Sequence, residues 1–274
     1  MSLRFRVLGV VGVVLSSSLL TIGCSTSAPS AEPESTAADS VVAVDKTESA
    51  LTSDRPRHQA RESIAQFGTL DQLNRAILDG PTTAGEVGRS GDFGVGTYNA
   101  LDGEMIVLDG VVYRFTSDGV LRVAKHNDLV PFAAVTRFRT DQDFVISSPL
   151  ADYAGLQGFV SNALPDQNRL FALKVHGTFT SIKTRAPRRQ VKPYPTLAEA
   201  TKTQVEFTNT NIRGTLVGFR LPAYLGTANA TGYHFHFVSD NHQVGGHVLD
   251  VAVNWATVEA QNVEHLQLNV ADED

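Results

Sequence analysis

Three histidines near the end of the chain are spaced so that they could bind one metal ion. Successive side chains of a strand point to opposite faces, so His234 and His236 share a face. The polar run 239–243, followed by two glycines, predicts a hairpin turn. If the hairpin folds about residues 241 and 242, residue 236 lies opposite His247, and directly opposed residues share a face. His247 therefore joins the pair, whereas His242 lies at the turn, a poor position for a fourth ligand.

Three imidazoles without a fourth protein ligand are typical of a catalytic metal site, which keeps one coordination position open for water or substrate. A structural zinc site usually has four protein ligands. The alternative is a histidine-rich pair of strands that binds no metal, but the third histidine in register favours a metal site. The ligands leave the ion open, because imidazole suits zinc, copper, iron and nickel.

Two further side chains could take part in chemistry. Glu104 follows an Asp-Gly turn between apolar residues; a carboxylate on such a turn is usually solvated, but beside a metal it could move protons. Arg185 lies near the end of a predicted strand, where a guanidinium could hold a carboxylate substrate with two hydrogen bonds. The alternative for Arg185 is an exposed basic loop. That alternative is our expectation for three later basic residues, Arg188, Arg189 and Lys192.

The elements that must position these residues are mostly strands. Helices are expected from Thr69 through Ile77, from Thr82 or Thr83 to about Arg89, and over residues 148–164. Strands are expected at residues 105–108, 111–115, 120–123, 132–138, 170–182, 204–221, 232–238, 247–256 and 265–270. The glycines of segment 91–105 allow tight turns and close backbone approach, but the lysine and helix of a phosphate loop are missing. The predicted class is α+β with largely antiparallel or mixed sheets and a metal site on a C-terminal hairpin.

Composition narrows the class of protein. The chain has 274 residues, 42% of them hydrophobic, enough to bury a sizeable core. Its formal net charge of -6, with lysine and arginine scattered, provides no basic face and argues against a nucleic-acid partner.

The N-terminus predicts export. Arg4 and Arg6 precede an apolar run at 7–15, which is typical of a secretory signal and too short for a membrane span. The segment resembles a bacterial lipoprotein signal ending at Cys24, the single cysteine, although Thr21 stands where that family usually has leucine. We therefore expect residues 1–24 to be a signal, 25–60 a disordered tether, and 61–274 the folded domain, with two α/β subdomains meeting at about residue 165. The expected location is the cell envelope, with the lipid as the membrane contact, or outside the cell.

Several segments together resemble the alpha-acetolactate decarboxylase family. They are GDFGVGTYNALDGEM at 91–105, KTR at 183–185 with KPYP at 192–195, RGTLVGF at 213–219, GYHFHF at 232–237 and GGHVL at 245–249. The resemblance extends over residues 67–270, nearly all of the expected domain. Motifs in this order and spacing are far more specific than any one of them.

The resemblance implies an enzyme with one Zn²⁺ per chain that converts (S)-2-acetolactate (2-hydroxy-2-methyl-3-oxobutanoate) to (R)-acetoin and CO2, in acetoin and butanediol biosynthesis. The family's zinc ligands correspond to His234, His236 and His247, and its active-site glutamate and arginine to Glu104 and Arg185. Thr97 corresponds to a residue that lines the substrate pocket. A homodimer is also expected by resemblance. Some members add a glutamate from a C-terminal tail; here only Glu273 stands near the end, and we assign it no role.

Two other functions stay open. One is a metal-binding lipoprotein that keeps the histidines but has lost catalysis. The other is a different metal-dependent enzyme acting on a small oxo-acid, because fold and ligands alone do not fix a substrate. Glu104 and Arg185 favour an enzyme, since a metal carrier has no use for that pair.

Overall fold

The computed structural model describes residues 62–270. The predicted signal, the tether, Cys24 and Glu273 lie outside the described residues. Within the described part, most residues of the regular elements are in strands and few are in helices, as the sequence predicted. No described helix has both the length and the apolar character needed to cross a membrane.

The first sheet has seven strands in the order β14-β1-β8-β3-β4-β5-β6. Their bounds are β14 (His265–Asn269), β1 (Ser63–Phe67), β8 (Phe132–Thr136), β3 (Phe93–Thr97), β4 (Glu104–Leu108), β5 (Val111–Phe115) and β6 (Leu121–Val123). Neighbours are antiparallel except β1 and β14, which run parallel. A separate pair joins β2 (Thr82–Thr83) to β7 (Leu129–Val130).

The second sheet contains the long strands. Its members are β10 (Leu170–Ala186), β11 (Val205–Leu221), β12 (Gly232–Ser239), β13 (Gly245–Val263) and the short β9 (Gln142–Ile146). β10 pairs with both β11 and β13, and β12 joins β11 to β13, so these four strands close on one another. β9 pairs with residues 256–260 of β13. Each sheet takes one strand from across residue 165, and the division into subdomains there stays a prediction.

Helices are short and begin at side-chain caps. They are α2 (Leu70–Asn74), α3 (Ala84–Ser90), α4 (Tyr153–Ala163) and α5 (Leu197–Ala200), with single 3-10 turns η1 (Asn99–Leu101), η2 (Thr201–Thr203) and η3 (Ala223–Leu225). Capping boxes at Thr69, Thr83 and Thr196 satisfy the first backbone N–H groups of α2, α3 and α5. The first two caps confirm the predicted helix starts.

Two helix predictions were too long. The helix after Thr69 ends at Asn74, and Ala76 has a left-handed φ of 63°. The helix predicted from residue 148 begins at Tyr153, because Asp152 caps it and the backbone of Leu150 bonds to Val253 instead. In both cases apolar residues keep a helical spacing in the sequence outside the residues whose backbone is helical.

The glycines of segment 91–105 show both of the expected uses, a close backbone approach and a tight turn, although the strand β3 within the segment was not predicted. A Cβ on Gly94 would lie 2.1 Å from the Ala134 carbonyl oxygen, and one on Gly96 would lie 2.5 Å from that of Phe132. The glycines therefore allow β8 to approach β3 closely rather than forming turns. The predicted turn at Gly103 is present, with a φ of 108°. β1 and β9 were not predicted.

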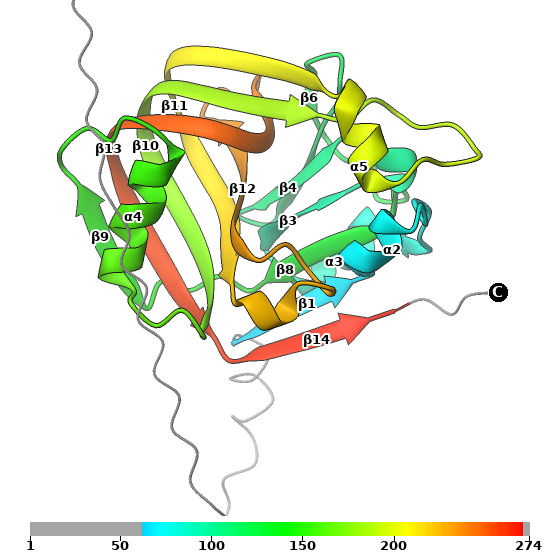
Figure 1. The fold of residues 1–274 in the computed structure, drawn as a ribbon, viewed down its shortest axis with the longest axis horizontal. Helices are drawn as coiled ribbons and strands as arrows, with labels where there is room; N and C mark the ends of the chain where they lie inside the picture. Colours follow the sequence, from blue (N-terminus) through cyan, green and yellow to red (C-terminus); the bar gives the residue numbers. More distant parts are fainter. Residues whose placement is uncertain (1–61, 271–274) are drawn as a thin grey trace, which may run out of the picture. The chain divides into compact units, whose positions relative to one another are not determined.

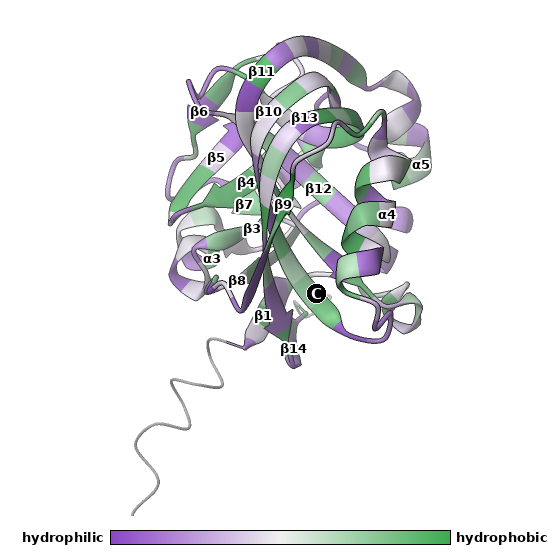
Figure 2. Cartoon of the chain, turned by 90° about the vertical axis from the view of Figure 1, so that its left-hand side faces the viewer, coloured by the Kyte–Doolittle hydropathy of each residue, from purple (hydrophilic) through white to green (hydrophobic). Residues whose placement is uncertain are grey.

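Two hydrophobic clusters fix the position of β12. Phe235 and Phe237 lie in a cluster with residues of β10, β13 and α4. A second cluster contains residues of both sheets, including Phe93 and Ile106 from the first and Val217 and Val238 from the second. Hydrophobic and hydrophilic bands alternate along the long strands (Figure 2), as expected for strands with one buried face.

Candidate metal centre

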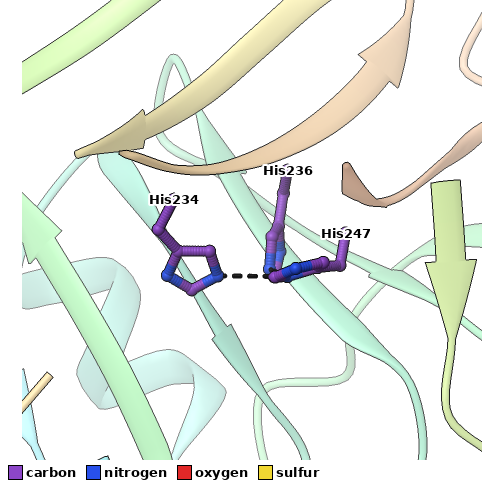
Figure 3. Close-up of side chains that lie close together, drawn as sticks. All are labelled: His234, His236 and His247. Atoms are coloured by element: carbon purple, nitrogen blue, oxygen red, sulfur yellow. Dashed lines mark hydrogen bonds between the residues drawn. The ribbon is translucent and has the colours of Figure 1, made fainter. Parts of the chain in front are cut away.

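The three histidines lie on the hairpin that the sequence predicted. His236 is paired with His247, and Val238 with Gly245, which is the expected register. Figure 3 shows the three rings converging from β12 and β13. The other face of β12 carries Phe235 and Phe237 into the core, so burial of these phenylalanines directs the histidines the opposite way.

The ring nitrogens are close enough to share one ion. His234 Nε2 lies 3.2 Å from His247 Nδ1, and His247 Nδ1 lies 3.3 Å from His236 Nε2. All three ligand atoms are within 4.8 Å of one another. A tetrahedral ion with metal–nitrogen bonds of about 2.0–2.1 Å places its ligand nitrogens about 3.3 Å apart. The observed separations therefore fit a first-row divalent ion.

A backbone carbonyl fixes the orientation of the central ring. His236 Nδ1 lies 2.7 Å from the Met105 carbonyl oxygen, and because a carbonyl can only accept, Nδ1 carries the proton. The lone pair of His236 is then on Nε2, the atom that faces His247. Such a bond from the second ring nitrogen is the usual support of a metal-binding histidine. No sequence signal could have revealed it, since every residue has a carbonyl.

Burial keeps the three imidazoles neutral, which is the form that binds metal. Loss of solvation lowers the pKa of His234 to about 4, and the positive charge of Arg185 lowers it further. The same loss of solvation holds the pKa of His236 and His247 well below the ordinary value, with smaller contributions from neighbouring charges. Three neutral imidazoles with neighbouring ring nitrogens are thus grouped at one place, which suits a cation.

Glu104 is buried beside the histidines rather than solvated. Glu104 is the first residue of β4, and only 6% of it is exposed. Its Oε2 lies 3.5 Å from His236 Nε2. Burial raises the pKa of Glu104 to about 7, although Arg185 opposes the shift. Since His236 is neutral, the contact is not an ion pair. Thr97 supports the turn before Glu104 by donating a hydrogen bond of 2.8 Å to the Gly103 carbonyl oxygen.

Arg185 reaches the same place from the end of β10. A bulge between Lys183 and Thr184 shifts the pairing by one residue, so that Arg185 lies opposite His247 instead of Val248. Nη1 donates to Gln204 Oε1 at 2.8 Å. Nε is buried and has no hydrogen-bond partner among the residues that the structure describes. The buried N–H therefore remains free to bind a ligand, because an unpartnered buried donor is costly.

The predicted site residues all line one small cavity. It has a volume of about 120 Å³, and Thr97, Glu104, Arg185, His234, His236 and His247 all line it. The rest of its wall was not predicted from the sequence: Leu70, Leu73, Gly96, Leu101, Phe132, Pro187, Leu197, Thr201 and Ala230. α2 and α5, which are neighbours in Figure 1, supply part of this wall. These residues come from many separate segments, so no local pattern groups them.

A wider hollow of about 800 Å³ lies on the other side of η1. It is lined by Asp79, Asp102, Arg114 and Tyr194 among others, and none of the predicted site residues reaches it. The guanidinium of Arg114 there is already bound by the carboxylates of Asp102 and Asp128. Of the two hollows, the smaller one is lined by Arg185 and His234, each of which has a buried nitrogen without a partner among the described residues.

Comparisons with known proteins agree on one family. The family model described as alpha-acetolactate decarboxylase matches residues 64–274. A protein of that name from Methylococcus capsulatus is 40% identical over 215 residues, covering 78% of this chain and 82% of its own length. Another from Bacillus subtilis strain 168 is 36% identical over 219 residues, with coverages of 79% and 86%.

Solved structures give the same result. The crystal structure of alpha-acetolactate decarboxylase from Bacillus subtilis strain 168 has a TM-score of 0.75 at 35% identity, covering 77% of this chain and 90% of the other. A Staphylococcus aureus protein described as similar to alpha-acetolactate decarboxylase has a TM-score of 0.73 at 32% identity, with coverages of 76% and 89%. This chain therefore has the fold of these two solved proteins.

Proposed function

The chain belongs to the alpha-acetolactate decarboxylase family, and we propose that it converts (S)-2-acetolactate to (R)-acetoin and CO2 in the cavity at the histidines. The reaction breaks the bond between the carboxylate carbon and the adjacent carbinol carbon. The electron pair passes toward the neighbouring ketone oxygen, and a proton then adds to the carbinol carbon. The site must therefore hold a carboxylate, polarise an oxygen and supply a proton.

We propose Zn²⁺ as the ion held by His234, His236 and His247. The support is the set of three neutral nitrogen ligands at separations that suit tetrahedral coordination. Three protein ligands leave one position open, as in catalytic rather than structural sites. When bound, the ion would act as a Lewis acid toward the oxygen atoms of the substrate.

The proposed role of Arg185 is to bind and orient the carboxylate of the substrate. A guanidinium offers donors in a planar fork that matches two carboxylate oxygens. The buried Nε of Arg185 has no partner of its own, and the residue lines the cavity beside His247. Holding the carboxylate there also fixes the orientation of the bond that breaks. The entropy cost of orienting the reacting groups is then met on binding and not in the transition state.

The proposed role of Glu104 is to move the proton. Its pKa of about 7, caused by burial, leaves comparable amounts of the acid and the carboxylate near neutral pH. The apolar wall around it, including Leu73, Leu101 and Phe132, would exclude water and accept the methyl groups of the substrate. Protonation from one fixed side of the carbon would give a single enantiomer.

A single observation carries the proposal: three converging histidines, a buried carboxylate and a guanidinium with a free donor line one small cavity in a member of this family. The test is to incubate the purified protein with racemic acetolactate and to resolve the acetoin by chiral chromatography. We expect (R)-acetoin and one CO2 for each acetoin. Absence of acetoin with zinc, manganese and cobalt each supplied would contradict the proposal.

We also propose that the protein is exported and held at a membrane by lipid on Cys24. The support is the sequence of residues 1–24. Cys24→Ala should move the protein from the membrane fraction to the soluble fraction when expressed in a bacterium that processes lipoproteins. Unchanged partitioning of the variant would contradict lipid attachment.

A further inference from the structure

Arg185 is held by an amide although a carboxylate is close by. In the pairing of β10 with β11 the residue directly opposite Arg185 is Glu206. Arg185 nevertheless donates its hydrogen bond to the neutral side chain of Gln204, with 2.8 Å between Nη1 and Oε1. An amide oxygen orients a guanidinium without neutralising its charge. Among the described residues, therefore, no carboxylate is hydrogen-bonded to Arg185, and its guanidinium can still pair with an anion in the cavity.

The amide of Gln204 is itself fixed at its other end. Its Nε2 donates to Glu206 Oε1 at 3.1 Å, and the other oxygen of Glu206 accepts from Lys183 Nζ at 2.6 Å. The carbonyl end of Gln204 must then face Arg185 and the NH2 end Glu206. Gln204 thus bridges Arg185 and Glu206 through hydrogen bonds. The carboxylate of Glu206 forms its ion pair with Lys183 instead.

Gln204 is also tied to the wall of the cavity. It directly follows η2, and its backbone N–H donates to the carbonyl oxygen of Thr201 at 3.3 Å. Thr201 lines the cavity. The position of the amide is therefore set by the same turn that closes one side of the site.

The side of the guanidinium that Gln204 binds also matters. Nη1 lies away from the Nε–H, so this bond leaves the edge formed by Nε and Nη2 open. That edge can grip a carboxylate with two parallel hydrogen bonds. Nε is the buried atom that has no partner in the described part of the chain.

We propose that Gln204 is a positioning residue that holds Arg185 in the cavity against the attraction of Glu206, with the Nε edge free for the carboxylate of the substrate. The inference rests on the proposed function, because it assigns that carboxylate to Arg185. Without the amide, Arg185 would turn toward Glu206 and form an ordinary ion pair. Binding of the substrate would weaken, while the histidines would be unaffected.

The experiment compares four forms of the full-length protein: wild type, Gln204→Met, Gln204→Met with Glu206→Gln, and Lys202→Met. Methionine keeps the length of glutamine but cannot orient the guanidinium. For Gln204→Met we expect kcat/KM for acetoin formation to fall about 10- to 100-fold, mainly through KM, as for loss of a hydrogen bond to a charged group. Metal content and thermal midpoint should stay at wild-type values.

The double variant separates positioning from a merely structural role. Removing the charge of Glu206 removes the competing partner, so the double variant should recover at least part of the lost kcat/KM. Lys202→Met, an exposed change in the same turn, should match wild type. Equal kcat/KM in Gln204→Met and wild type, or no recovery in the double variant, would overturn the inference.

A crystal structure of Gln204→Met decides the inference even if the protein forms no acetoin. We expect the Arg185 guanidinium to pair with Glu206 in the variant and to lie in the cavity in wild type. An unmoved guanidinium in the variant would overturn the positioning role. Failure of the proposed function would instead appear as absence of acetoin in wild type.

Discussion

Two arginines of the second sheet, Arg220 and Arg185, differ in the partners that the fold gives their guanidinium groups. Arg220, on β11, is only 2% exposed and donates to the carbonyl oxygens of Leu164 and Asp166, both at 2.6 Å. Its guanidinium also lies over the ring of Phe171, 4.7 Å from the centroid. Because Leu164 is the C-cap of α4, Arg220 satisfies one carbonyl at the end of the helix and a second one, that of Asp166, in the loop that follows. Folding alone provides its contacts.

Arg185, by contrast, lines the cavity and donates a hydrogen bond to the side-chain amide of Gln204. The buried Nε of both arginines lacks an acceptor in the described chain, and that of Arg185 belongs to a residue that lines the cavity. Near it, three histidine lone pairs and a buried carboxylate also face the cavity. At the α4 junction the folded chain itself therefore supplies acceptors for both terminal nitrogens of the guanidinium, whereas the groups that line the cavity are arranged to bind a ligand. Changes at the junction should affect stability, and changes at the cavity should affect turnover.

The largest effect should come from the metal ligand that is most buried. His236→Ala removes one of three ligands, and we expect acetoin formation to fall more than about 10⁴-fold together with loss of bound metal. Metal analysis and the acetoin assay measure the two effects. His242→Ala is the matched control, because His242 stacks on Tyr113 outside the triad. Retention of both metal and activity in His236→Ala would refute the ligand assignment.

Glu104→Gln should come next. The variant keeps the size of the side chain but cannot give up or take a carboxyl proton, so kcat should fall about 10³-fold while the metal remains bound. The pKa of Glu104, raised to about 7 by burial, also predicts that wild-type kcat changes with pH near neutrality and that this inflection disappears in the variant. A kcat within a few-fold of wild type would exclude Glu104 as the proton carrier.

At the α4 junction, Arg220→Met should act on stability. Methionine keeps much of the apolar contact but leaves the buried carbonyl oxygen of Leu164 and the part-buried one of Asp166 without donors, so the free energy of unfolding should fall by about 2 kcal/mol. Urea denaturation measures this, and kcat of the folded fraction should stay unchanged. If Arg220→Met lowered kcat without lowering stability, the contrast between the two arginines would fail.

Arg185→Met should show the reverse behaviour. Loss of the charged donors should lower kcat/KM about 100-fold, equal to about 2.7 kcal/mol, with metal content unchanged. Stability should change little, because the fold provides this guanidinium with few contacts. Arg189→Met, at an exposed arginine, is the control. Loss of metal in Arg185→Met would show that the residue supports the ion instead of the substrate.

The sequence was sufficient for the hairpin but not for the cavity. His234, His236 and His247 could be placed together because a strand repeats every two residues and a polar turn sets the register. For Gly94 and Gly96 the sequence indicated a turn or a close strand contact but could not choose between them, since glycine marks both. Gln204 and Arg220 were missed because their partners lie on segments distant in sequence or are backbone carbonyls, which leave no pattern.

A zinc titration tests the central claim most directly. The purified protein is stripped with a chelator, and the rate of acetoin formation from racemic acetolactate is followed as zinc is added. If the three histidines form the catalytic metal site, the rate should be negligible without metal and rise to a plateau at one zinc per chain, and His236→Ala should stay inactive throughout. Full activity in the stripped protein, or no acetoin at any level of zinc, manganese or cobalt, would contradict the account.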